Sequence, residues 1–245
     1  MDSVFGCAVT PSANPATIEA LAELRDVSSY FALGTGPLKD SWCPVGRLYD
    51  DTALLAETVD RVQARMDVTE LRVAASTFFL GFAARLWSIS VGSVAGYGML
   101  VDLPPERLLF HDDDGRIALH LEQPETRPRN DLPAALADMV LDQHLTPLAL
   151  ALRRLGPISE KLLLGNTASA LLGAARVFDR DRATTSGWDL ARRICTDPRL
   201  SAAVRIGDTD YRRTSCCLYY RTRDGGLCGD CALDRVPERN RDDRL

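Results

Sequence analysis

The longest apolar stretch of the chain, AASTFFLGFAARLWSISVGSVAGYGML at residues 74–100, decides the fold. A run of this length is long enough for a membrane-spanning helix. Arg85 lies near its middle, however, and an arginine at mid-bilayer costs at least ~2.5 kcal/mol. Glycines interrupt the run as well. We therefore predict buried helices of a water-soluble core, in two pieces that break near residues 90–92.

On the N-terminal side of this stretch, the sequence predicts two more helices. Asn14 and Pro15 are a good N-cap and first-turn pair, and apolar residues then recur at helical spacing, which predicts a helix over residues 15–31. A segment rich in glycine and proline breaks this pattern. Apolar residues from Leu54 to Met66 then indicate the second helix.

On the C-terminal side, RLLFHDDDGRIALHLE at residues 107–122 has two short apolar segments around Asp-Asp-Asp-Gly, which is typical of an antiparallel hairpin. Capping residues and prolines then predict further helices. These cover residues 131–145, 147–154, 160–178 and 186–195.

The predicted fold class is therefore α+β, predominantly helical, with a small antiparallel hairpin or sheet and a cysteine-rich C-terminal segment. A chain of 245 residues can bury a substantial core without cross-links. We expect a mainly helical body over residues 1–204, residues 205–236 folded back on it, and a charged, mobile tail at 237–245.

Composition and charge narrow the functional classes. Hydrophobic residues make up 46% and charged residues 26%, as in ordinary globular proteins, and the net charge of −5 argues against a nucleic-acid partner. No basic residue precedes Arg25, so the start of the chain lacks the charged region of a secretory signal. These features indicate a cytoplasmic protein without a membrane span.

Four of the seven cysteines lie within sixteen residues, in SCCLYYRTRDGGLCGDCAL at 215–233. In the cytoplasm stable disulfides are disfavoured, so clustered thiols more often hold metal or carry out redox chemistry. The other three are scattered, and we interpret them as buried or incidental thiols: Cys7, Cys43 and Cys195.

Spacing helps to separate the kinds of metal site. Zinc modules usually draw on cysteine pairs with two to four residues between them, as between Cys228 and Cys231. Cys216 and Cys217 are adjacent, and neighbouring side chains of an extended segment diverge, so one ion would require a bent backbone. A binuclear cluster offers two metal atoms and more geometric solutions. A purely structural zinc site stays open as an alternative.

The predicted helix at 160–178 carries a second unusual feature. Its sequence LLLGNTASALLGAARVF places glycine and alanine at intervals that would let another backbone come close. Asn166, between apolar turns, must be hydrogen-bonded or face a cleft.

Together these residues resemble a known family. The arrangement CC, ten residues, then CxxC is similar to the C-terminal motif of FhuF-type ferric siderophore reductases, in which four cysteines hold a 2Fe-2S cluster. LLLGNTASALLGAARVF also resembles the family's Gly-Asn-x-x-Ser helix, and LRVAASTFFLGFAARLWS resembles its earlier Arg and Ala-Ser region. The cysteines that match position by position are Cys216, Cys217, Cys228 and Cys231.

The resemblance implies a cytoplasmic oxidoreductase of iron homeostasis that reduces the Fe(III) of a ferric siderophore, most often of hydroxamate type, and releases Fe(II). Hard Fe(III) is held tightly by oxygen ligands and Fe(II) weakly, so one electron opens the chelate. An external donor such as a ferredoxin or a flavoprotein reductase is implied as well.

Candidate substrate residues are polar or cationic side chains that interrupt apolar helices or follow the cysteine pair, although salt bridges, caps or packing would explain each of them too. They are Arg72, Arg85, Asn166, Ser169, Arg176, Tyr219 and Tyr220. The sequence gives no reason to treat His111, His120 or His144 as metal ligands. Two alternative functions are a zinc-stabilised binding module and a non-catalytic iron or redox sensor, although the sequence shows no DNA-binding motif or basic face.

Overall fold

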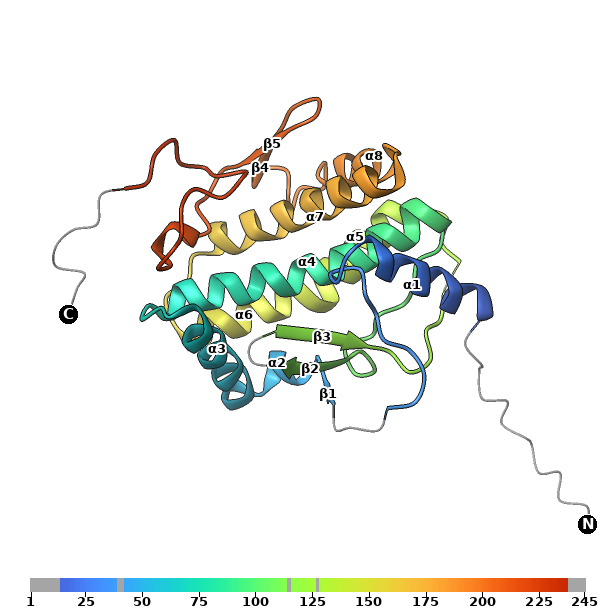
Figure 1. Cartoon of the computed structure of the whole chain (residues 1–245), viewed down its shortest axis with the longest axis horizontal. Coiled ribbons are helices and arrows are strands. Elements are labelled where there is room, and N and C mark those ends of the chain that lie inside the picture. The colour runs from blue at the N-terminus through green and yellow to red at the C-terminus, as the bar shows by residue number, and fades with distance from the viewer. Residues whose placement is uncertain (1–13, 39–41, 114–115, 127, 238–245) are drawn as a thin grey trace, which may run out of the picture.

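Two long helices form the centre of the protein, whose computed structural model describes residues 14–38, 42–113, 116–126 and 128–237. Helix α4 (Leu71–Tyr97) and helix α7 (Glu160–Arg182) pack along each other, and the shorter helices surround them (Figure 1). Helices dominate and the strands are few and antiparallel, so the predicted α+β class is confirmed.

Helix α4 runs unbroken through residues 90–92, so the predicted break is wrong. The glycine there serves packing, because a Cβ on Gly92 would overlap the side chains of Leu24 and Phe31. The helix ends at Gly98, which takes the left-handed conformation with φ 64°. Although α4 is long and apolar enough to cross a membrane, 67% of its most apolar window is buried inside the protein, which makes it a core helix.

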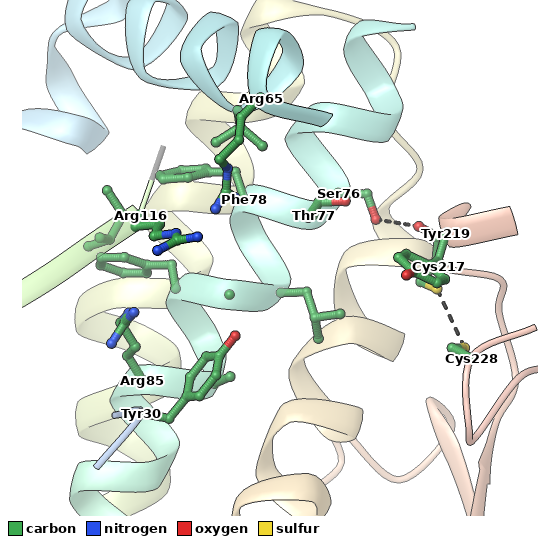
Figure 2. A pocket seen from close by; sticks show the side chains of 16 residues that line it. Tyr30, Arg65, Ser76, Thr77, Phe78, Arg85, Arg116, Cys217, Tyr219 and Cys228 are labelled. Carbon is green, nitrogen blue, oxygen red and sulfur yellow. Dashed lines mark hydrogen bonds between the residues drawn. The ribbon is translucent and has the colours of Figure 1, made fainter. Parts of the chain in front are cut away.

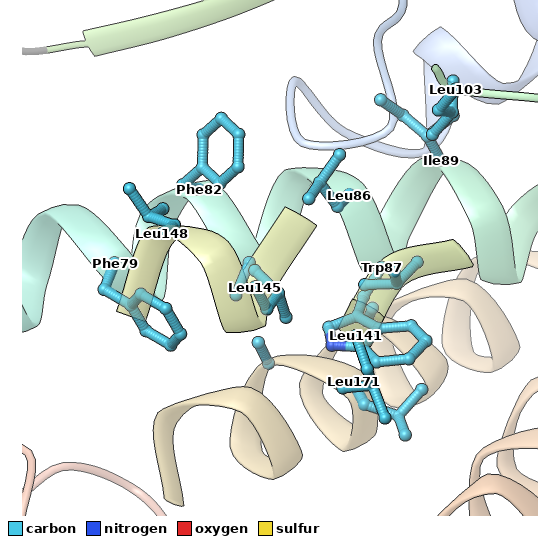
Figure 3. Packing of buried hydrophobic residues seen from close by; sticks show 14 of the residues in the cluster. Phe79, Phe82, Leu86, Trp87, Ile89, Leu103, Leu141, Leu145, Leu148 and Leu171 are labelled. Carbon is cyan, nitrogen blue, oxygen red and sulfur yellow. The ribbon is translucent and has the colours of Figure 1, made fainter. Parts of the chain in front are cut away.

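The core lies mainly around α4. Figure 3 shows Phe79, Leu86 and Trp87 of α4 among leucines of the neighbouring elements, with Leu141 and Leu171 close to Trp87. All of these side chains are almost wholly excluded from solvent. Burial of this kind, at about 25 cal/mol per Å² of apolar surface, supplies most of the driving force for folding.

Helix α1 (Pro15–Val27) begins where predicted, because the Asn14 side chain accepts a hydrogen bond from the Ala16 amide at 3.1 Å. It stops at Val27 rather than at residue 31, since Ser28 is extended and Phe31 turns into the core. Next come α2 (Arg47–Asp50), which the sequence did not predict, and α3 (Thr52–Met66), which did follow the predicted pattern.

The predicted hairpin is formed by β2 (Leu109–Asp113) and β3 (Arg116–His120), which pair antiparallel. A third strand, β1 (Cys43–Pro44), adds to the edge of β2, giving the order β1-β2-β3. A strand of only two residues is too short to show the alternation of apolar and polar side chains, so β1 could not be predicted from the sequence.

The helices after the hairpin follow the predicted order. Asp131 caps α5 (Leu132–Val140), which continues through a π-helical turn (Leu141–Leu145) into α6 (Thr146–Leu155). Helix α7 extends to Arg182, four residues beyond the predicted end at 178, and α8 (Ser186–Ile194) lies within the predicted range.

The buried His144 stabilises the π-helical turn. Its ring nitrogens bond the Tyr49 hydroxyl at 2.7 Å and the Leu103 carbonyl at 2.6 Å, and burial lowers its pKa to about 4. Both ring nitrogens of this neutral imidazole are therefore occupied by hydrogen bonds within the core.

The last part of the described chain lies against α7 and α4 (Figure 1). Strands β4 (Val204–Ile206) and β5 (Tyr211–Arg213) form a second antiparallel hairpin, and a single turn of 3₁₀ helix (Tyr219–Arg221) follows. The expected mobile tail lies outside the described residues from 238 onward.

Candidate functional site

The cysteine motif occupies the irregular segment directly after β5. Its backbone turns sharply at Leu218, which adopts the left-handed conformation with φ 68°. This turn lets the Leu218 amide reach back to the Cys216 sulfur at 3.3 Å. The chain therefore turns sharply directly after the adjacent cysteines.

Two of the four sulfurs lie close enough together to bind one metal ion. The Cys217 and Cys228 sulfurs are 3.5 Å apart, close to the ~3.8 Å expected for two thiolates that share one tetrahedral metal at about 2.3 Å. The Leu233 amide donates to the Cys231 sulfur at 3.4 Å, a contact typical of sulfur ligands in iron-sulfur proteins. Among the residues that the structure describes, no three metal-binding side chains converge as ligands of one ion.

The electrostatics favour ionisation at one cysteine of this pair. The pKa of Cys217 is lowered to about 6, chiefly because the Cys228 thiol donates a hydrogen bond to it, and the Arg213 guanidinium also contributes. Cys228 keeps the shared proton, which raises its pKa. The donor chemistry thus fits a thiolate-bound metal group.

The segment is fixed to both central helices. A Cβ on Gly165 of α7 would overlap the Ser215 hydroxyl, which instead donates to the Lys161 carbonyl at 2.7 Å. On α4, the Ser76 hydroxyl donates to the Cys217 carbonyl at 2.7 Å. The glycine and the serine therefore seat the cysteine pair on the helices.

A buried cation links the two halves of the motif. Arg213, 3% exposed, pairs with the Asp230 carboxylate at 3.0 Å, and Asp230 lies between the last two cysteines. Its guanidinium also donates to the Asn166 side-chain oxygen at 2.7 Å and to the Ser169 hydroxyl. The amide of Asn166 in turn donates to the Ser76 hydroxyl at 3.0 Å.

A pocket of about 370 Å³ opens beside the cysteines. Cys217, Cys228 and Tyr219 line one end of it, and α4 forms its floor (Figure 2). Gly81 belongs to that floor, and a Cβ there would meet nothing within 4 Å. The volume lies in the range of small-molecule sites.

Two of the predicted substrate residues, Arg85 and Tyr219, lie on this pocket. Asn166 and Ser169 instead bind Arg213 beneath the cysteine segment, and Asn166 is 0% exposed. Both supply the hydrogen bonds that a buried polar group requires, and neither lines the pocket.

The remaining predicted substrate residues have partners elsewhere. Arg72 pairs with Glu70 at 2.7 Å, and the Arg176 guanidinium lies over the Tyr211 ring, 5.8 Å from its centroid. The Tyr220 hydroxyl accepts a hydrogen bond from Arg221 at 3.1 Å. None of the three lines the pocket.

Sequence reasoning missed the residues that hold the motif together, above all Arg213, Asp230 and Ser76. A signal was present, because the arginine directly precedes the cysteine pair and the aspartate stands inside CGDC. Of the other thiols, Cys195 is buried and Cys43 is partly exposed, and both lie outside the cysteine motif. Cys7 lies outside the described residues.

Two protein-family models match this chain. Residues 213–233 match the FhuF 2Fe-2S C-terminal domain, and residues 99–213 match the model described as ferric iron reductase FhuF-like transporter. The chain belongs to the FhuF-like family. The cofactor of this FhuF-like protein is therefore a 2Fe-2S cluster, and its broad class is iron-sulfur ferric reductase. None of the curated proteins matches the chain.

Proposed function

We propose that this FhuF-like protein is a cytoplasmic ferric siderophore reductase. It takes up one electron from a separate donor, such as a ferredoxin or a flavoprotein reductase. It then passes that electron to the Fe(III) of a chelate, which leaves as Fe(II) and free chelator. The cluster, when bound, supplies the one-electron carrier.

Cys216, Cys217, Cys228 and Cys231 would hold the cluster. The support is chemical and geometric, since the motif brings two sulfurs to 3.5 Å and directs backbone amides at two others. Residues 205–236 then form the cluster-binding segment, seated on the helical body by Ser76 and Gly165.

The main support for the proposal is that two of the motif cysteines line the pocket. Cys217 and Cys228 line the same cavity as α4, so a molecule bound there touches the cysteine segment without any rearrangement. Electron transfer requires such close approach. Cys217 itself is only 5% exposed, which keeps water and free chelators away from its sulfur.

Anaerobic single-turnover reduction tests the proposal. The purified protein should contain two irons per chain and absorb visible light, in keeping with its 2Fe-2S domain. After reduction, mixing with ferric siderophores, beginning with trihydroxamates, should restore the oxidised spectrum far faster than buffer alone. One zinc per chain and no colour would instead show a zinc-stabilised binding module, and a stable cluster that no ferric chelate reoxidises would indicate a sensor.

Filling the pocket separates chelate docking from reoxidation at the surface. Gly81→Leu should abolish chelate-dependent reoxidation while leaving the cluster spectrum unchanged, because its side chain would enter the open floor. Gly81→Ala adds one methyl group and serves as the matched control. Equal rates for both variants would show that chelates react elsewhere.

A further inference from the structure

Three arginines converge on the pocket from three different elements. Arg65 comes from α3, Arg85 from α4 and Arg116 from β3. Figure 2 shows them at the end of the pocket opposite Cys217 and Cys228. Among the described lining residues there is no aspartate or glutamate.

The charge of Arg85 is only weakly compensated. It donates to the Ser29 carbonyl at 3.0 Å and lies over the Tyr30 ring, 5.0 Å from the centroid, and burial lowers its pKa. A carbonyl and a ring face orient the guanidinium but bring no negative charge. Arg65 is exposed, and no ion pair joins it to another described residue.

Two other arginines of the chain, by contrast, are neutralised by carboxylates beside them. Arg61, one turn before Arg65, bonds both Glu57 and Asp112 at 2.6 Å. Arg199 binds three aspartates. The chain as a whole carries a net charge of −5, so an arginine-lined pocket is a local positive field on an acidic protein.

We propose that this pocket selects ferric chelates that carry a net negative charge, such as those with free carboxylates beyond the groups that bind iron. The inference rests on the proposed function and adds the charge of the substrate to it. The anionic periphery of the chelate meets the arginines, while its iron-bearing side faces the cysteine end of the pocket. Arginine suits this role because it binds carboxylates through two parallel hydrogen bonds.

A charge series of one chelator tests this selection. A linear trihydroxamate with a terminal amine, its N-acetyl derivative and its N-succinyl derivative form ferric complexes with one positive charge, no charge and one negative charge. The iron coordination is the same in all three. We expect the second-order reoxidation rate of the reduced protein to rise about tenfold from the cationic to the anionic complex, and the rise to shrink at high salt.

Equilibrium binding gives a readout that does not depend on electron transfer. The gallium(III) complexes of the same three chelators accept no electron, and calorimetry should show the same order of affinity. The variant Arg65→Gln/Arg116→Gln should remove most of the charge dependence, whereas Arg192→Gln, on the exposed face of α8 and outside the pocket, should keep it.

The two proposals fail differently. Equal rates and equal gallium affinities for the three complexes, in the presence of fast reoxidation, would overturn the charge selection and leave the reductase intact. Graded gallium binding without reoxidation by any ferric complex would refute the reductase and support the anion-selective pocket. A charge order that survives in Arg65→Gln/Arg116→Gln would also overturn the inference.

Discussion

Replacing Arg213 by methionine should destabilise the protein more than any exposed arginine substitution in the same segment. The Arg213 side chain is 2% exposed, and its guanidinium makes two bonds to the Asp230 carboxylate, at 3.0 and 3.2 Å. Its loss leaves that carboxylate, itself 10% exposed, without its cation and removes a donor from the buried Asn166 oxygen. Breaking a buried ion pair from one side costs about 3–5 kcal/mol.

The assay is urea unfolding of the anaerobically purified protein, followed by far-ultraviolet circular dichroism and by the cluster absorbance. We expect a loss of about 3 kcal/mol in the free energy of unfolding for Arg213→Met. A large part should return in Arg213→Met/Asp230→Leu, where both charges are gone. The midpoint potential should fall in the single variant, because the lost cation favoured the more negative, reduced state.

Arg223→Met is the matched control. Arg223 belongs to the same segment and pairs with Asp67 at 3.3 Å, but both side chains are about three-quarters exposed, at 76% and 75%. Exposed pairs contribute little, about 0–1 kcal/mol. If Arg213→Met cost no more than Arg223→Met, or if the double variant cost the sum of its single changes, the buried pair would not organise the motif.

Three further predictions concern the helices. Gly165→Ala should displace Ser215 and lower the iron content of the purified protein, measured against Gly81→Ala, which meets open space. His144 is protonated more readily in the unfolded chain, where its pKa is about 6.5, than in the fold, where its pKa is about 4. The free energy of unfolding should therefore rise by about 3 kcal/mol from pH 4 to 6.5. Urea titrations of His144→Gln should show a much smaller rise over the same pH range. Cys195→Ser should leave the visible spectrum unchanged, because this thiol is buried and burial raises its pKa to about 12.

Helices with strong caps were the most predictable part of the fold. Asn14 and Asp131 begin their helices as the sequence indicates, because a side-chain oxygen beside a free amide is a local interaction. The break expected in α4 failed for a tertiary reason, since Gly92 makes room for Leu24 and Phe31, which are distant in sequence. The two-residue β1 likewise depends on its partner strand.

The candidate site also contains residues that could be predicted from local sequence and residues that could not. The four cysteines could be picked out because their spacing is local, and Arg85 because a cation interrupts an apolar run. The positions of Arg65 and Arg116 beside it could not be predicted, since α3 and β3 reach the pocket only through the packing of the whole protein. Asn166 was expected to bond or to face a cleft, and it bonds.

The upstream motifs and the cysteine motif form one connected structure. Within Gly-Asn-x-x-Ser, Gly165 admits the segment, while Asn166 and Ser169 hold Arg213. In the Ala-Ser region of α4, Ser76 receives the Asn166 amide and donates to the Cys217 carbonyl. Each group in this hydrogen-bond network is the partner of the next, so the loss of one side chain leaves a buried polar neighbour unpaired. The two helices α4 and α7 therefore hold the cysteine pair in its position beside the pocket.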